Sequence, residues 1–173
     1  MKKLIILLCM AAVLCGCSKA EPTTEATTER ELPITGYHYE GAVFSVPSDW
    51  TTETKDGQFY IYPDDKSVLV ITYDSRVLEE FEDDTLDRLI ETAGLTGNET
   101  TSSRIATTKY GYQLAEVNGL DDLEGGTYWI YLDVILTPKG TYTFSMLNDT
   151  VYGDTDHLYM TDLSDIINTF RME

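Results

Sequence analysis

Carboxylates dominate the ionisable side chains of this sequence. Its 173 residues include 30 Asp and Glu but only 12 Lys and Arg, for a formal net charge of −18. Three acidic runs stand out, at residues 64–65, 79–84 and 121–124. Calcium takes about six to eight oxygen ligands, many of them carboxylates. None of the runs has the D-x-[DN]-x-[DN]-G loop, and carboxylates also occupy turns and helix starts. We therefore expect no metal site, with calcium binding as an alternative.

The other side chains that could do chemistry form no recognisable catalytic group. His38 and His157 have no second His or Cys at ligand spacing, which excludes a structural zinc site. His157 ends an Asp-Thr-Asp-His run that suits a polar loop before a helix better than an acid–base pair. No serine lies in G-x-S-x-G, and the chain has neither a P-loop nor G-x-G-x-x-G. We expect no catalytic residue and no cofactor.

The cysteines lie only at the start of the chain, as Cys9, Cys15 and Cys17. The run Leu14-Cys15-Gly16-Cys17 resembles the lipobox of bacterial lipoproteins, in which a cysteine thiolate takes a diacylglyceryl group. Small residues before that cysteine let a signal peptidase approach the backbone. Cys15 fits the lipidated position less well because the bulky Leu14 precedes it. We predict lipidation at Cys17.

The segments around Cys17 agree with that prediction. Lys2 and Lys3 precede an apolar run at residues 4–14, which is typical of a secretory signal. The run is too short for a transmembrane helix, which needs roughly 20 apolar residues. We therefore assign residues 1–16 to a signal peptide. Residues 17–35 would be a lipidated cysteine and a disordered Thr- and Glu-rich tether. Residues 36–173 would form a single acidic domain.

The charge of the chain limits its partners. A strongly acidic surface repels phosphate backbones, so we expect no nucleic-acid binding. We expect contact with a membrane through the lipid anchor, and a possible envelope protein as partner. The sequence does not define the oligomeric state.

Short apolar runs predict strands in the first half of the domain, at residues 37–39, 42–46, 58–62 and 67–73. The last run, Ser-Val-Leu-Val-Ile-Thr-Tyr, is apolar at both odd and even positions, which is typical of a strand covered on both faces. The spacing then changes to i, i+3, i+4, i+7 and predicts an amphipathic helix at residues 84–93.

The second half repeats this order. Strands are predicted at residues 101–108, 111–118, 127–137 and 141–147. A final helix is predicted from Met160, Leu163, Ile167 and Phe170. Short turns join most strands, so the sheet should be mainly antiparallel. Because two strands are apolar on both faces, we predict an α+β fold: a three-layer α-β-α sandwich with a helix on each face.

Two motifs carry a family resemblance. The run from Phe44 to Trp50, FSVPSDW, resembles the F-x-[VI]-P-x-x-W segment near the start of PsbP-like domains. The run from Ile166 to Phe170 is similar to their I-x-x-[ST]-F ending. The resemblance covers roughly residues 37–171. It implies an antiparallel sheet between helices, structural roles for Pro47 and Trp50, and binding or assembly. Fold alone does not decide function.

The leading hypothesis is a membrane-anchored extracytoplasmic lipoprotein that acts as a non-catalytic interaction module in the cell envelope. Its 12 tyrosines favour a tyrosine-bearing binding face, although tyrosine also suits strands. A free sheet edge is the other candidate surface. The alternatives are a small-ligand or calcium-binding lipoprotein and, least favoured, a hydrolase acting on wall material.

Overall fold

The computed structural model describes residues 33–96, 99–123, 126–148 and 158–173. All of these belong to one compact unit, Leu32–Glu173. Cys17, the signal, most of the tether and His157 lie outside the described residues.

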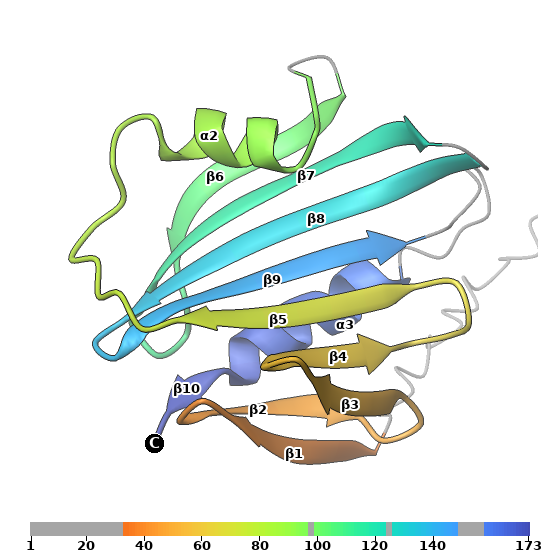
Figure 1. Cartoon of the computed structure of the whole chain (residues 1–173), viewed down its shortest axis with the longest axis vertical. Coiled ribbons are helices and arrows are strands. Elements are labelled where there is room, and N and C mark those ends of the chain that lie inside the picture. The colour runs from red at the N-terminus through yellow and green to blue at the C-terminus, as the bar shows by residue number, and fades with distance from the viewer. Residues whose placement is uncertain (1–32, 97–98, 124–125, 149–157) are drawn as a thin grey trace, which may run out of the picture. The chain divides into compact units, whose positions relative to one another are not determined.

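A seven-stranded antiparallel sheet forms the larger part of the structure (Figure 1). Its strands lie in the order β3-β4-β5-β9-β8-β7-β6, and every neighbouring pair is antiparallel. Their bounds are β3 (Thr51–Lys55), β4 (Gln58–Tyr62), β5 (Val68–Asp74), β6 (Thr100–Thr107), β7 (Gln113–Leu123), β8 (Gly126–Thr137) and β9 (Gly140–Asn148).

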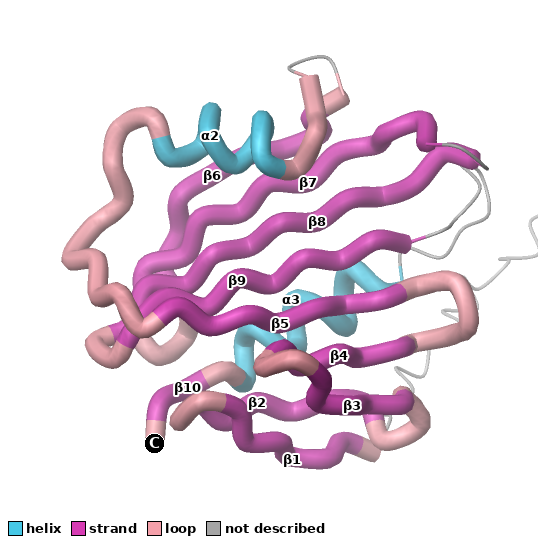
Figure 2. Tube along the Cα trace, viewed as in Figure 1, coloured by secondary structure: helices cyan, strands magenta, loops and turns pink. Residues whose placement is uncertain are grey.

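A second sheet has three strands, in the order β1-β2-β10. They are β1 (Ile34–Tyr39), β2 (Ala42–Pro47) and β10 (Arg171–Met172). A tight turn with positive φ at Glu40 and Gly41 joins β1 to β2. The two residues of β10 then pair with the start of β2, which brings the end of the chain beside its first described hairpin (Figure 2).

The helices lie on opposite faces of the large sheet (Figure 1). Helix α2 (Thr85–Thr92) contacts β7 and β6. Helix α3 (Leu158–Thr169) contacts β2 and contributes Leu163, Ile166 and Ile167 to the main core. Thr169 Oγ1 accepts a hydrogen bond from the Ser45 amide, 2.9 Å away, which holds the end of α3 against β2.

The main core fills the space between the two sheets and α3. Phe59, Ile71 and Phe144 extend into it from the large sheet, and Phe44 from the small sheet. Phe170, just after α3, packs edge-on against Phe144 with ring centroids 5.7 Å apart. Burial of these aromatic and aliphatic side chains supplies most of the driving force for folding.

The predicted three-layer α-β-α sandwich is wrong. The structure is β-rich, with two antiparallel sheets and two short helices among the described residues. The first two strands do not join the large sheet, because the chain turns after Pro47 and re-enters as β3 at its edge. One face of the large sheet is therefore packed by a second sheet together with α3. On the other face, the eight-residue α2 covers only the side near β6 and β7.

Most predicted elements are found near their expected positions. The helix predicted at residues 84–93 is α2, and the predicted C-terminal helix is α3. Strands β3 and β10 were missed. The sequence of β3, Thr-Thr-Glu-Thr-Lys, has no apolar side chain and gives no alternating signal, because β3 lies at the sheet edge with one pairing neighbour. β10 is too short to be recognised from sequence.

Candidate functional site

The residues that the structure describes cover only part of the large-sheet face that carries α2. Cross-strand pairing joins Val68 to Leu147 and Leu147 to Ile130 in one row. A second row joins Val70 to Ser145 and Ser145 to Leu132. Directly paired residues of an antiparallel sheet share a face, and their neighbours along the strand point the other way. These six side chains therefore lie opposite the core residues Leu69, Phe144 and Met146.

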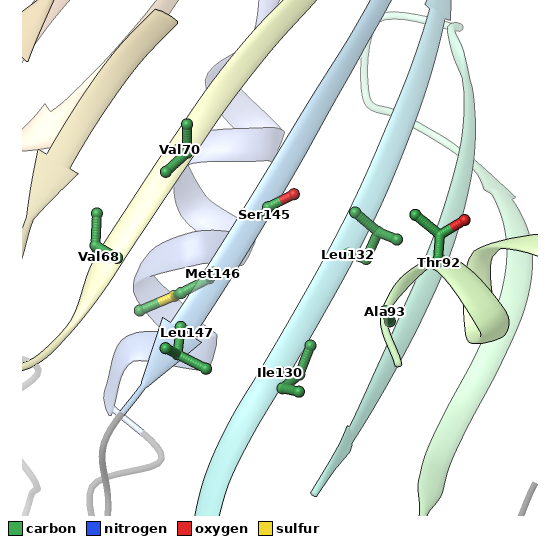
Figure 3. A pocket seen from close by; sticks show the side chains of 9 residues that line it. All are labelled: Val68, Val70, Thr92, Ala93, Ile130, Leu132, Ser145, Met146 and Leu147. Atoms are coloured by element: carbon green, nitrogen blue, oxygen red, sulfur yellow. The ribbon is translucent and has the colours of Figure 1, made fainter. Parts of the chain in front are cut away.

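Helix α2 forms one side of this surface. Leu86 and Leu89 of α2 pack, together with Phe81, over a small buried cluster from β7 and β8 (Ala115, Val134 and Leu136). The helix ends before it reaches β9, and Thr92 and Ala93 at its end lie beside Ile130 and Leu132 (Figure 3). A shallow cavity of about 280 Å³ lies between α2 and β5.

Two stacked tyrosines form the other side. Tyr60 of β4 pairs with Val70 and so lies on the same face. Its ring stacks on Tyr62, with centroids 6.3 Å apart and planes only 9° from parallel. The Tyr60 hydroxyl donates to Gln58 Oε1 at 2.6 Å, and the Tyr62 hydroxyl donates to Glu53 Oε1 at 2.7 Å. The bond to Glu53 raises the pKa of Tyr62. These bonds hold both rings in place.

We call this surface the open face. It is an apolar floor between the α2 helix and the tyrosine pair, and it comprises Tyr60, Tyr62, Val68, Val70, Ile130, Leu132, Ser145 and Leu147. Ser145, at its centre, is exposed, and Leu132 is buried. The other six are half-buried. No carboxylate, histidine or lysine is among the residues that line the cavity. The open face can therefore bind apolar surface, and the Ser145 hydroxyl at its centre has no histidine or carboxylate beside it in the cavity lining.

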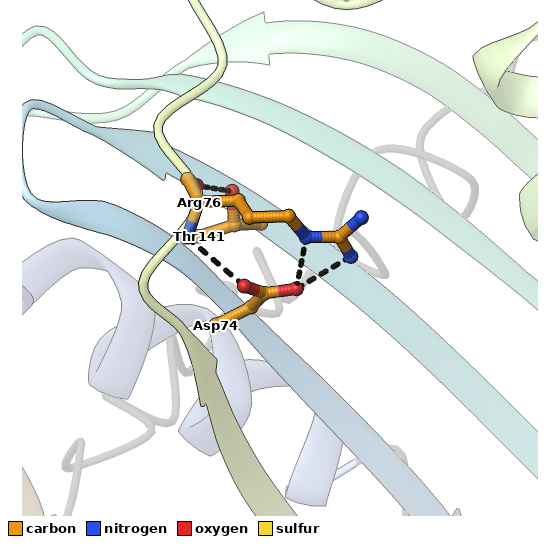
Figure 4. Close-up of polar contacts among 3 residues, drawn as sticks. All are labelled: Asp74, Arg76 and Thr141. Carbon is orange, nitrogen blue, oxygen red and sulfur yellow. Dashed lines mark hydrogen bonds and ion pairs between the residues drawn. The ribbon is translucent and has the colours of Figure 1, made fainter.

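The connection from β5 to α2 borders one end of the open face. It leaves β5 at a clamp in which Arg76 Nε and its amide donate to the Asp74 carboxylate at 2.8 and 2.9 Å (Figure 4). The Arg76 carbonyl accepts from Thr141 Oγ1 of β9 at 3.3 Å. The ion pair lowers the pKa of Asp74 and raises that of Arg76. This clamp fixes the direction in which the chain leaves the sheet.

The same connection then reaches β7 and carries the acidic run at residues 79–84. Gln113 at the start of β7 donates through Nε2 to the Glu79 carbonyl at 2.9 Å. The segment thus passes the ends of β9, β8 and β7. Its carboxylates are exposed, and Arg88 pairs with two of them, Glu82 at 2.6 Å and Asp84 at 3.6 Å. In the part of the chain that the structure describes, Glu79, Glu80 and Asp83 make no ion pair.

A polar row crosses the opposite, core-side face. Arg104 of β6 donates to the Glu116 carboxylate of β7, and Glu116 pairs in register with Asp133 of β8. Asp133 is only 6% exposed. Burial, and secondarily the charge of Glu116, raises the pKa of Asp133 well above its ordinary value. Asp133 thus forms a polar row with Arg104 and Glu116 on the core side of the large sheet.

The other residues singled out from the sequence lie at separate positions in the structure. Pro47 ends β2, and the buried Trp50 joins the main core, so both have structural positions away from the open face. His38 lies at the surface with Nδ1 2.9 Å from Glu173 Oε1. Within residues 33–96, 99–123, 126–148 and 158–173, no group of three or more His, Cys, Asp or Glu side chains could hold a metal ion.

The structure divides the tyrosines between the open face and the core. Tyr39, Tyr131 and Tyr142 are buried in the core, whereas Tyr60 and Tyr62 lie on the open face with an apolar floor beside them. The aliphatic floor residues were not identified as a site. Their signal was present in the sequence, as strands apolar at both odd and even positions, but it was interpreted as two-sided packing.

No protein-family model matches the sequence, and no curated protein matches it. Among solved structures, a protein from Bacteroides thetaiotaomicron has a TM-score of 0.54 at 16% identity. The match covers 77% of this chain but 45% of that one, so this chain spans less than half the length of its structural neighbour. It supports the fold alone. PA94, a protein of unknown function from Pseudomonas aeruginosa, matches with a TM-score of 0.44 at 15% identity, over 74% of this chain and 90% of its own.

Since no family model matches, the PsbP-like resemblance stays a prediction. Within the described ranges, neither helix is long and apolar enough to cross a membrane.

Proposed function

We propose that this chain is a membrane-anchored extracytoplasmic lipoprotein whose folded part is a non-catalytic binding module. The anchor would be Cys17, exported by the signal at residues 1–16. The binding surface would be the open face. The partner would be a protein of the cell envelope.

The observation that carries the binding role is the half of the large sheet that the described residues leave uncovered. Aliphatic side chains on both faces of a strand normally indicate cover on both faces. Here the side chains of Val68, Val70, Ile130 and Leu147 are half-buried, and α2 stops short of them. A contiguous, partly exposed apolar surface beside aromatic side chains favours an interaction surface.

The same geometry argues against a small-ligand carrier. Cavities that bind small molecules are commonly about 300–1,000 Å³, enclosed, and provided with a few convergent polar groups. This cavity has about 280 Å³, lies open on a sheet face, and has no carboxylate in its lining. A broad, shallow apolar surface fits a macromolecular partner better.

The test is site-specific photo-crosslinking of the full chain in intact cells of its native host. A photoreactive amino acid replaces Ser145, which is exposed at the centre of the open face. The matched control replaces Thr54, an exposed β3 residue that pairs with the buried Phe59 and so faces away from the open face. We expect a discrete protein adduct from position 145 and none from position 54. Adducts of equal yield at both positions, or none at either, would reject the open face as a binding site.

A further inference from the structure

We propose that the partner of the open face is an amphipathic α-helix with cationic side chains, which lies beside α2 over β9. This inference rests on the proposed function and names the chemistry of the partner. Spacing, backbone hydrogen bonding and charge support it independently.

The width of the open face matches one helix. Helix α2 lies over β7 and β6, and β9 is the second strand from β7. Strands lie about 4.8 Å apart, so β9 is roughly 10 Å from β7. Packed helices are separated by about 8–10 Å between axes. The tyrosine pair on β4 lies two strands beyond β9 and limits the space on the other side. A single helix therefore fits between α2 and the tyrosines.

Backbone hydrogen bonding favours a helix over an extended peptide. The backbone groups of β5, β9 and β8 already pair with their neighbours on both sides. An extended peptide laid across this face would bury its own N–H and C=O groups without partners, which is costly. A helix satisfies those groups internally and presents a stripe of side chains at i, i+3, i+4 and i+7. The apolar floor can pack against such a stripe.

The negative charge of this chain favours cationic side chains on the polar side of the partner helix. The chain carries a net −18, and the acidic run at residues 79–84 borders one end of the open face. Glu79, Glu80 and Asp83 make no ion pair among the described residues, and the exposed Asp87 and Glu91 lie on α2. Lys or Arg residues on the flanks of the partner would be attracted by this field. A second copy of this chain would bring another −18 to the interface, so self-association is disfavoured.

The test measures binding of defined peptides to the full lipidated chain in nanodiscs of zwitterionic lipid, with empty discs as the blank. The probe is a fluorescent 18-residue Leu/Lys peptide whose leucines form a helical stripe. One control peptide has the same composition in a scrambled order, and the other has Glu in place of Lys. We expect binding of the Leu/Lys helix, and at least about tenfold weaker binding of both controls.

A variant of the chain tests whether the Leu/Lys peptide binds at the open face. Ser145→Arg puts a cation at the centre of the floor without removing a core side chain. We expect it to weaken binding of the Leu/Lys peptide about tenfold, because the bound peptide would bury an unpaired charge. The matched control Thr54→Arg adds the same charge on the opposite side and should leave affinity within about twofold.

A second variant tests the charge. Glu79→Gln, Glu80→Gln and Asp83→Asn together should weaken binding several-fold and flatten its salt dependence. Its control neutralises an equal number of exposed carboxylates away from the open face, at Asp49, Asp56 and Asp165.

Equal binding of the scrambled peptide, no effect of Ser145→Arg, or no binding of the Leu/Lys helix would each overturn the proposed partner. The two proposals fail separately. If the position-145 adduct forms in cells but no Leu/Lys helix binds, the open face remains a binding site and the cationic helix is rejected. If neither is observed, both proposals are rejected.

Discussion

Asp133 is the residue whose environment differs most from that of an ordinary carboxyl group. It lies at the centre of β8, pairs with Phe144 on one side and Glu116 on the other, and is only 6% exposed. Burial penalises its charged form most, and the Glu116 charge adds to that effect. Asp133 is therefore protonated in the folded state over a pH range in which it ionises in the unfolded chain.

The sign of the resulting pH dependence follows from linkage. Above the ordinary Asp pKa of 3.8, the unfolded chain loses this proton while the folded chain retains it. The free energy of unfolding therefore falls as pH rises, until the raised pKa of the folded state is passed. Asp133→Asn removes this pH-dependent fall in the free energy of unfolding, because an amide does not titrate.

We expect Asp133→Asn to match the wild type in stability near pH 4 and to exceed it by at least about 1 kcal/mol at pH 8, since one pKa unit corresponds to about 1.4 kcal/mol. Urea denaturation of both proteins across this range measures the difference. The exposed Asp65→Asn serves as control. A stability difference between the Asp133 variant and wild type that stays constant with pH would contradict the assigned environment.

At the scale of elements, the segment after α2 depends on a glycine in β7. Gly119 leaves room for Leu95 and the Glu99 carbonyl, which lie directly above it. A Cβ at this position would be 2.5 Å from the Glu99 oxygen and 2.7 Å from Leu95 Cδ1. Backbone cannot move aside as easily as the end of a flexible side chain.

Gly119→Ala should therefore destabilise the fold by about 1–3 kcal/mol, the usual cost of overpacking. Gly36→Ala in β1 is a suitable control, since no atom lies within 4 Å of its Cβ position. Thermal melts of the two variants measure the effect. Equal midpoints would mean that the segment between α2 and β6 does not pack on β7 as described.

Elements with strong periodicity could be predicted from the sequence, and their assembly could not. The i, i+3, i+4, i+7 stripe gave α2 and the alternation in residues 58–62 gave β4, because local burial shapes both patterns. The second sheet pairs β2 with β10, from the far end of the chain. No local pattern encodes such a contact.

The open face illustrates the same limit. The sequence showed Val68, Val70, Ile130 and Leu132 as apolar residues in strands apolar on both faces. The expectation that each face is covered within the chain led to the α-β-α prediction. The described residues leave the β5–β9 part without a helix, and only the structure distinguishes a surface covered by the chain itself from one left for a partner.

At the scale of the whole molecule, the proposed account joins an anchor to a binding module. The net charge of −18 would hold the folded part away from anionic lipid head groups. It also makes nucleic acids poor partners. The open face carries few of these charges, so it is an apolar binding surface on a strongly acidic molecule.

The anchor gives a prediction of its own. Cys17→Ser removes the thiol that would take the diacylglyceryl group, so the variant should not incorporate an alkyne-tagged fatty acid in growing cells. Two or more acyl chains give stable attachment to a membrane, and their loss should release the chain after signal cleavage. Fractionation together with in-gel detection measures both effects. Undiminished labelling of the variant would contradict lipidation at Cys17, and Cys15→Ser, which should retain the label, is the control.

The central claim is that the open face is occupied in the cell, and cysteine accessibility tests it most directly. Ser145→Cys and Thr54→Cys each place one thiol in a folded domain whose sequence has none. The alkylation rate of each is measured on intact native cells and on the purified chain. The account predicts that position 145 reacts several-fold more slowly on cells than in the purified protein, while position 54 reacts at equal rates in both. Equal rates at position 145 would show that the open face is unoccupied and would contradict the account.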